Sequence, residues 1–315
     1  MKTAISGIKR VRIPYFTSML TGLCIALYFA IGFVSDFGTI SEDTYILFGA
    51  PYAVDIYLGQ FWGVITNSFI HILWYQLVGN LLLLLILGTV VERRSGSLHL
   101  FLFGLIASTI TSCFQLALSN DAGLGLSGVN FALFGFVLAR YFTDEKYKNV
   151  QIGAISALLS TILVLCIYLN LYQSWNFGLA SMYSGFLWGV IIGATRHPIV
   201  KYFSYPLIFS TIIFCTVSLF YAPWAAEWQF SQGVLAHERG DKTAAIRNYT
   251  ECIKIDPAHT LAKDNLKLIR IDELSVQAYN AHRKGDLSRA RELYLEILKK
   301  DPKNAWAKAN LQQLP

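Results

Sequence analysis

The strongest constraint on this chain comes from seven apolar segments, each about long enough to cross the hydrocarbon core of a membrane. Hydrophobic residues make up 54% of the sequence and charged residues only 15%, which is too apolar for an average soluble protein. The segments contain no acidic residue and no lysine, and they lie at residues 13–35, 72–91, 98–119, 124–141, 151–171, 178–195 and 203–222. We therefore expect an all-α fold that begins with a polytopic bundle of membrane helices.

The distribution of lysine and arginine predicts the orientation of this bundle, because cytoplasmic connectors carry an excess of both. The connectors 36–71, 119–124 and 171–178 carry neither. The remaining connectors and the N-terminus hold Lys2, Lys9, Arg10, Arg12, Arg93, Arg94, Arg140, Lys146, Lys148, Arg196 and Lys201. Residues 1–12 are thus predicted to be cytoplasmic, and everything after Tyr221 extracytoplasmic. The net charge of +6 then reflects membrane topology, and we expect no nucleic-acid partner. The half-apolar connector 36–71 is expected to lie in the membrane interface.

The membrane domain is expected to span residues 13–222, and a soluble helical array with a repeat of about 45 residues is expected over 223–315. Three short motifs recur in it: Gly240-Asp241 as Gly285-Asp286, Asp256-Pro257 as Asp301-Pro302, and residues 262–266 as 307–311. Each unit should hold a helix that ends at Gly-Asp, a second helix carrying Ala244 and Tyr249 or Ala290 and Tyr294, and a third short helix. The pattern resembles tetratricopeptide repeats, which implies a protein or peptide partner at this domain.

Metal and cofactor chemistry is not indicated by the sequence. The five cysteines have no CxxC spacing, so neither a zinc site nor a disulfide framework is predicted for Cys24, Cys113, Cys166, Cys215 and Cys252. We expect no cofactor.

A serine between two glycines opens the fourth apolar segment, in the run GLSG at residues 125–128. Small residues follow at helical spacing, at Ala132 and Gly135, and such residues let neighbouring membrane helices approach closely. One interpretation of Ser127 is therefore packing alone. The other is a nucleophile held at the entry of a helix.

Three motifs within residues 10–222 resemble those of the rhomboid family of intramembrane serine proteases. The run GLSG at 125–128 is similar to the nucleophile motif of the family, and QLVGN at 76–80 lines up with its His-x-x-x-Asn. The run GFLWG at 185–189 matches the glycines that bring the fourth and sixth helices of the family together. The resemblance implies six core spans plus one, a bacterial cytoplasmic membrane, and transmembrane segments as substrates or clients.

The resemblance also implies roles for individual residues. Ser127 takes the position of the nucleophile, and Gln76 and Asn80 take the positions that hold the oxyanion. The positions implied to support the site and its packing are Gly125, Gly128, Phe131, Gly185 and Gly189.

One position departs from the family in a way that bears on its chemistry. A serine hydroxyl needs a base to accept its proton during attack, and in the family that base is a histidine on the sixth helix. The matching residue here is Met182, and no histidine occurs between Ser127 and Arg196. A thioether is only a weak hydrogen-bond acceptor and cannot serve as a base at neutral pH.

Three hypotheses remain open at this point. The first is a rhomboid scaffold with little or no proteolytic activity that binds transmembrane segments or partner proteins. The second is an active intramembrane serine endopeptidase in which His71, the one histidine on the correct side of the membrane domain, replaces the base. The third is an unrelated seven-span transporter, against which stands the lack of ionisable residues in the spans.

Overall fold

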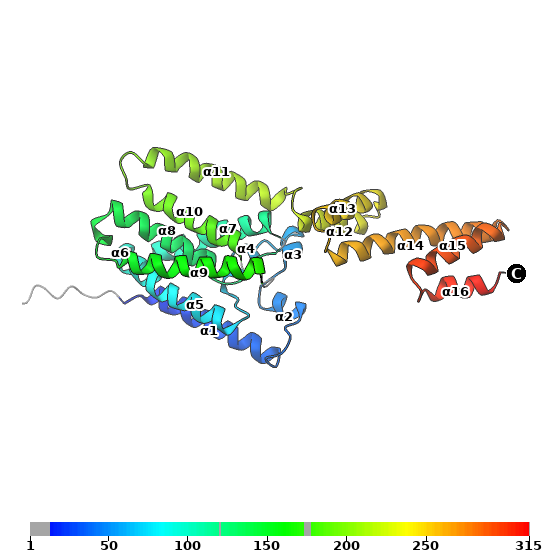
Figure 1. Cartoon of the computed structure of the whole chain (residues 1–315), viewed down its shortest axis with the longest axis horizontal. Coiled ribbons are helices and arrows are strands. Elements are labelled where there is room, and N and C mark those ends of the chain that lie inside the picture. Colours follow the sequence, from blue (N-terminus) through cyan, green and yellow to red (C-terminus); the bar gives the residue numbers. More distant parts are fainter. Residues whose placement is uncertain (1–12, 120, 173–177, 315) are drawn as a thin grey trace, which may run out of the picture. The chain divides into compact units, whose positions relative to one another are not determined.

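The computed structural model describes residues 13–119, 121–172 and 178–314; the predicted cytoplasmic N-terminus and most of the connector 171–178 lie outside these ranges. Within them every regular element is helical, which confirms the predicted all-α class. The chain divides into two compact units, Met1–Ala222 and Pro223–Pro315 (Figure 1).

Each of the seven apolar segments is helical in the first unit. Five of these helices are long and apolar enough to cross a membrane, namely α1 (Tyr15–Val34), the continuous helix Trp74–Ser95, α7 (Ser97–Leu118), α9 (Ile152–Tyr172) and α11 (Lys201–Phe220). The other two, α8 (Ser127–Thr143) and α10 (Leu179–Ala194), are shorter. The helix Trp74–Ser95 is built from α5 (Trp74–Leu83), the π-helical turn η2 (Leu84–Gly88) and α6 (Thr89–Ser95).

The first unit is centred on α8, which packs closely against α10. Most side chains of α8 are buried, including Val129, Ala132 and Phe136. A Cβ atom added at Gly185 would overlap the carbonyl oxygen of Gly128, and one added at Gly189 would overlap that of Ala132. Only glycine therefore lets the two backbones approach this far, as small residues do at membrane helix interfaces.

A buried carboxylate joins α1 to the helices α6 and α7. Glu92 is only 3% exposed. Its oxygens accept hydrogen bonds of 2.8 Å from the backbone N–H groups of Phe16 and Thr17, and of 2.6 Å from the hydroxyls of Thr17 and Ser97. Because the first turn of α1 has no side-chain cap of its own, this carboxylate satisfies amides that would otherwise lack acceptors.

The connector 36–71 is not an open loop. It forms the short helices α2 (Glu42–Leu47), α3 (Ala53–Tyr57), α4 (Gly63–Thr66) and the 3₁₀ turn η1 (Asn67–Phe69). Its end is fixed by polar contacts: the hydroxyls of Ser68 and Ser108 lie 2.6 Å apart, and Asn67 Nδ2 donates to the carbonyl of Pro51 at 3.1 Å. Its predicted place in the membrane interface stays a prediction.

The second unit consists of α12 (Ala226–Glu238), α13 (Lys242–Ile255), α14 (Thr260–Arg283), α15 (Leu287–Lys300) and α16 (Ala305–Gln312). The two Gly-Asp motifs have matching geometry. Gly240 and Gly285 both have positive φ, at 76° and 82°, and the carboxylates of Asp241 and Asp286 cap the helices that follow. Such left-handed positions at helix ends favour glycine.

Two details of the repeat differ from expectation. The third helix of the first repeat and the first helix of the second are one continuous helix, α14, because no glycine or proline interrupts residues 260–283. The buried alanine that corresponds to Ala290 is Ala245 rather than Ala244, whereas Tyr249 and Tyr294 are both fully buried as matching core residues.

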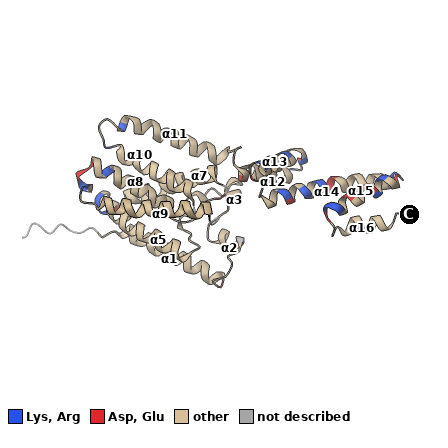
Figure 2. Ribbon diagram, in the orientation of Figure 1, with Lys and Arg blue, Asp and Glu red and all other residues tan. Residues whose placement is uncertain are grey.

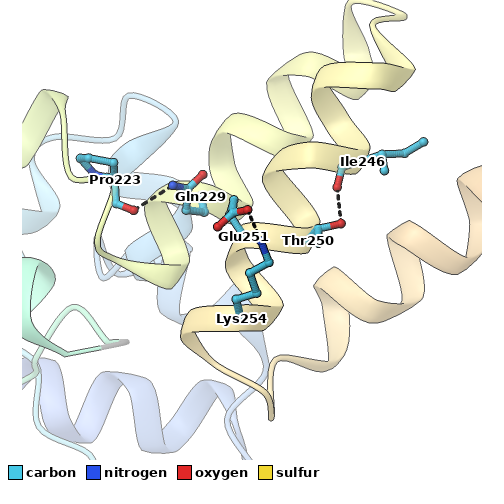
Figure 3. Close-up of polar contacts among 6 residues, drawn as sticks. All are labelled: Pro223, Gln229, Ile246, Thr250, Glu251 and Lys254. Atoms are coloured by element: carbon cyan, nitrogen blue, oxygen red, sulfur yellow. Dashed lines mark hydrogen bonds and ion pairs between the residues drawn. The ribbon is translucent and has the colours of Figure 1, made fainter.

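Side-chain hydrogen bonds fix the start of this unit (Figure 3). Gln229 Nε2 donates to the carbonyl of Pro223 at 2.8 Å, which holds the segment before α12 against that helix. On α13, the hydroxyl of Thr250 bonds to the carbonyl of Ile246, and Lys254 pairs with Glu251 on the surface.

The contact between α8 and α10 leads to a first prediction. Gly189→Ala should lower the free energy of unfolding by about 1–3 kcal/mol or more, because the new methyl group meets the backbone of Ala132, which cannot move aside. Gly104→Ala on α7 is the matched control, since nothing lies within 4 Å of a Cβ atom there. Thermal unfolding in detergent measures both. Equal effects of the two variants would contradict the packing account.

Candidate active site

A cavity of about 1000 Å³ lies beside the start of α8. Five predicted site residues line it: Ser127 for the nucleophile, Met182 for the base position, Gln76 and Asn80 for the oxyanion, and Phe131 for the aromatic support. They come from α5, α8 and α10, and the glycine contact holds the last two together. Further wall residues come from α9 and from the loop 121–124. The structure thus brings together residues that are far apart in the sequence.

Ser127 is the first residue of α8, and the loop before it is shaped by glycine. Gly125 has φ of 91°, a left-handed conformation that glycine adopts without strain. Its N–H donates to the carbonyl of Asn67 at 3.0 Å, which joins this loop to η1. The serine is half-buried and stands at a helix N-terminus, where partial positive charge favours a developing oxyanion.

Met182, which the sequence analysis predicted at the position of the base, lies in the cavity wall. The side chain is 5% exposed, and it belongs to the second turn of α10, whose residue Gly185 contacts the backbone of Gly128. None of the described residues that line this cavity is a histidine. Proton transfer from Ser127 therefore has no imidazole acceptor within the cavity.

His71 contacts the site from behind the Ser127 loop. Its Nδ1 lies 3.2 Å from the carbonyl of Phe69, and its Nε2 accepts from the N–H of Leu126 at 3.4 Å. Because a carbonyl can only accept, Nδ1 carries the proton and Nε2 is the acceptor. Both ring nitrogens are thus used in holding the chain on each side of the site. Burial lowers the pKa of His71 to about 4, so the ring is neutral at pH 7.

The amides expected at the oxyanion make contacts of their own. Gln76 Nε2 donates to the carbonyl of Leu124 at 2.9 Å, so this donor supports the loop before Ser127. Asn80 Oδ1 accepts from Asn130 Nδ2 at 3.1 Å, which leaves the amide nitrogen of Asn80 as the group that can face the cavity.

A polar network that the sequence analysis did not identify lies on the far side of Ser127. Gln115 Nε2 donates to Asp121 Oδ1 at 3.0 Å, and its Oε1 accepts from the N–H of Ser181 at the same distance. Asp121 also accepts from the N–H of Gly123 at 2.7 Å. Gln115 therefore joins α7, the loop before Ser127 and the start of α10. A second, small cavity of about 20 Å³ opens between Gln115 and Ser127. No local sequence pattern marks Gln115, because its two partners lie on other segments, the loop before Ser127 and α10.

Comparison with known proteins identifies the family of the first unit. A model of the Rhomboid domain matches residues 58–199. The rhomboid protease GlpG of Haemophilus influenzae is 30% identical over 145 residues, which are 45% of this chain and 71% of that protein. The chain belongs to the rhomboid family. The predicted resemblance is thereby confirmed, and the alternative of an unrelated transporter is set aside.

Other rhomboid proteases are similar over part of their length. GluP of Bacillus subtilis is 29% identical over 181 residues, and the chain covers 34% of that protein. GlpG of Yersinia pestis is 29% identical over 124 residues, with 41% of its length covered. With five helices long and apolar enough to cross a membrane, this rhomboid protein is an integral membrane protein. The helices α1 and α11 and the whole second unit lie outside the matched domain.

The environment of His71 predicts a dependence of stability on pH. The folded pKa is about 4 and the ordinary value is 6.5, so the unfolded chain takes up a proton first as the pH falls. Neutral His71 makes its full contribution to the free energy of unfolding above pH 6.5, and this contribution is lost as the pH falls from 6.5 to 4. At pH 5 the loss is about 2 kcal/mol. His71→Gln should flatten the profile of unfolding temperature over this range. A profile of His71→Gln that keeps the slope of the natural chain between pH 6.5 and 4 would contradict this account.

Proposed function

We propose that this chain is a rhomboid scaffold with little or no proteolytic activity, which binds transmembrane segments in the cavity beside Ser127. Met182 is the observation that carries the proposal. It lines the cavity together with Ser127 at the position where the family resemblance implies a histidine base. A thioether cannot accept the proton of the serine, whereas it adds apolar surface to a cavity that binds apolar side chains.

The composition of the cavity supports a helical, apolar client. Leu73 and Leu83 line it from the side of α5, and Ile162, Leu165 and Leu169 from α9. Of the residues in α9, only Leu159 and Cys166 are buried, so this helix has few neighbours within the unit. Apolar groups dominate the wall, and polar groups such as those of Asn80, Ser127 and Asp121 are few, as is usual for sites that bind and orient a ligand.

The alternative of an active endopeptidase requires His71 to act as the base. Its Nδ1 and Nε2 are engaged by Phe69 and Leu126, and the ring is 1% exposed. Proton abstraction would require the imidazole to leave the backbone that it holds in place. The geometry therefore favours a structural role for His71 and supports the inactive scaffold over this alternative.

We also infer an orientation and a role for the second unit. Lysine and arginine gather at one end of the first unit, where α6 and α8 end and α11 begins (Figure 2). This end should face the cytoplasm by the positive-inside rule, with Ser127 near the outer leaflet and the repeats outside. We propose that the repeats bind a protein or peptide, since arrays of paired helices present extended binding surfaces.

The loss of the base predicts a gain of activity. In liposomes with a model single-span substrate, the natural chain and Ser127→Ala should show no cleavage. Met182→His should introduce cleavage that is lost again in the double variant with Ser127→Ala. The gain should span several orders of magnitude, since removal of the base from a soluble serine protease costs about 10⁶-fold in turnover. Serine-dependent cleavage by the natural chain would contradict the proposal.

Client binding can be tested separately from catalysis. A photoreactive residue at Leu165, which lines the cavity, should crosslink to a labelled single-span peptide of about 20 apolar residues. The same substitution at Val164, which is 66% exposed on α9 but does not line the cavity, is the matched control. We expect a several-fold stronger adduct at Leu165 that excess unlabelled peptide removes. Equal crosslinking at both positions would argue against binding in the cavity.

A further inference from the structure

Two cysteines meet between α7 and α11. Cys113 on α7 and Cys215 on α11 are neighbours across the contact between these two helices, and they are 2% and 7% exposed. The neighbouring rings of Phe114 and Phe214 face each other with centroids 4.5 Å apart, so the two helices are in register here. Both thiols are reduced in the structure.

We propose that Cys113 and Cys215 form a disulfide bond that fixes the seventh helix to the third. In the reaction two S–H bonds break, one S–S bond forms, and two protons and two electrons pass to an oxidant. That oxidant is a small-molecule disulfide that can reach the buried pair, and it is reduced to two thiols. A disulfide has an S–S length of about 2.05 Å, so rotation of the two side chains must bring the sulfur atoms to this distance.

The position of the pair fits an oxidising compartment. Both cysteines lie five residues before the end of their helix, which is Leu118 in α7 and Phe220 in α11. That end of α7 leads into the loop that precedes Ser127, so the pair lies towards the end of the bundle that holds the cavity. In the orientation proposed above this end is extracytoplasmic, where disulfides form and persist.

The bond would restrain α11, the helix that leads to the repeats. Cys215 lies eight residues before Pro223, where the second unit begins. The helix α11 is mostly exposed, with only Ser204, Cys215 and Ser218 buried, so non-covalent packing holds it to the bundle over a small area. A covalent link to α7 closes a loop of about 100 residues and restricts the unfolded chain accordingly. Oxidation thus determines how firmly the helix that leads to the repeats is held.

The test uses the full chain in membranes, with a specific protease site inserted in the turn at residues 195–200 between α10 and α11. After treatment with the thiol oxidant diamide and cleavage, the two fragments should stay joined on a denaturing gel without reductant and separate when reductant is added. Cys113→Ser should abolish the joined band. Cys166→Ser and Cys252→Ser are the controls and should retain it.

A second measurement guards against effects of the insertion. In the chain without the protease site, maleimide labelling after denaturation should count all five thiols before oxidation and two fewer afterwards. With Cys113→Ser the count should not fall on oxidation. Fragments that separate after oxidation, an unchanged thiol count, or a joined band that persists with Cys113→Ser would each overturn the proposal.

Discussion

The close contact between α8 and α10 is the constraint on which the first unit depends. At Gly185 and Gly189 the backbones of the two helices approach so far that no side chain fits between them. This contact brings Ser127 and Met182, 55 positions apart in the chain, to one cavity. The packing of the site is therefore independent of its chemistry. Methionine stands at the predicted base position, and the glycine contact and the buried face of α8 are retained.

The loop before Ser127 is held in place by hydrogen bonds with three side chains. His71 holds the N–H of Leu126, Gln76 holds the carbonyl of Leu124, and Asp121 holds the N–H of Gly123. Each contact pairs a backbone group that has little access to water. Leaving such a group unpaired would be costly. These residues shape a rigid entrance to α8. A rigid entrance serves the recognition of a helix as well as it serves the orientation of a nucleophile.

The sequence predicted the helices of this fold better than the contacts within its site. A helix that crosses the membrane needs about 20 apolar residues, and runs of this length are easy to recognise. All seven long segments were therefore located within a few residues. The π-helical turn at Leu84–Gly88 was missed, because such turns are rare and the apolar run around it continues without a break. The role of Gln115 was missed because its partners are the side chain of Asp121 and the N–H of Ser181 on α10, which no short motif brings together. The contact of His71 with the N–H of Leu126, 55 residues further along the chain, was missed for the same reason.

The buried carboxylate of Glu92 has a consequence for how the protein is made. The first turn of α1 presents the N–H groups of Phe16 and Thr17, and their acceptor lies about 75 residues later in the chain. During synthesis α1 emerges well before α6, so its amino end has to remain at the lipid surface, hydrated, until Glu92 arrives. The start of α1 therefore completes its hydrogen bonding only after the chain has been synthesised as far as Glu92.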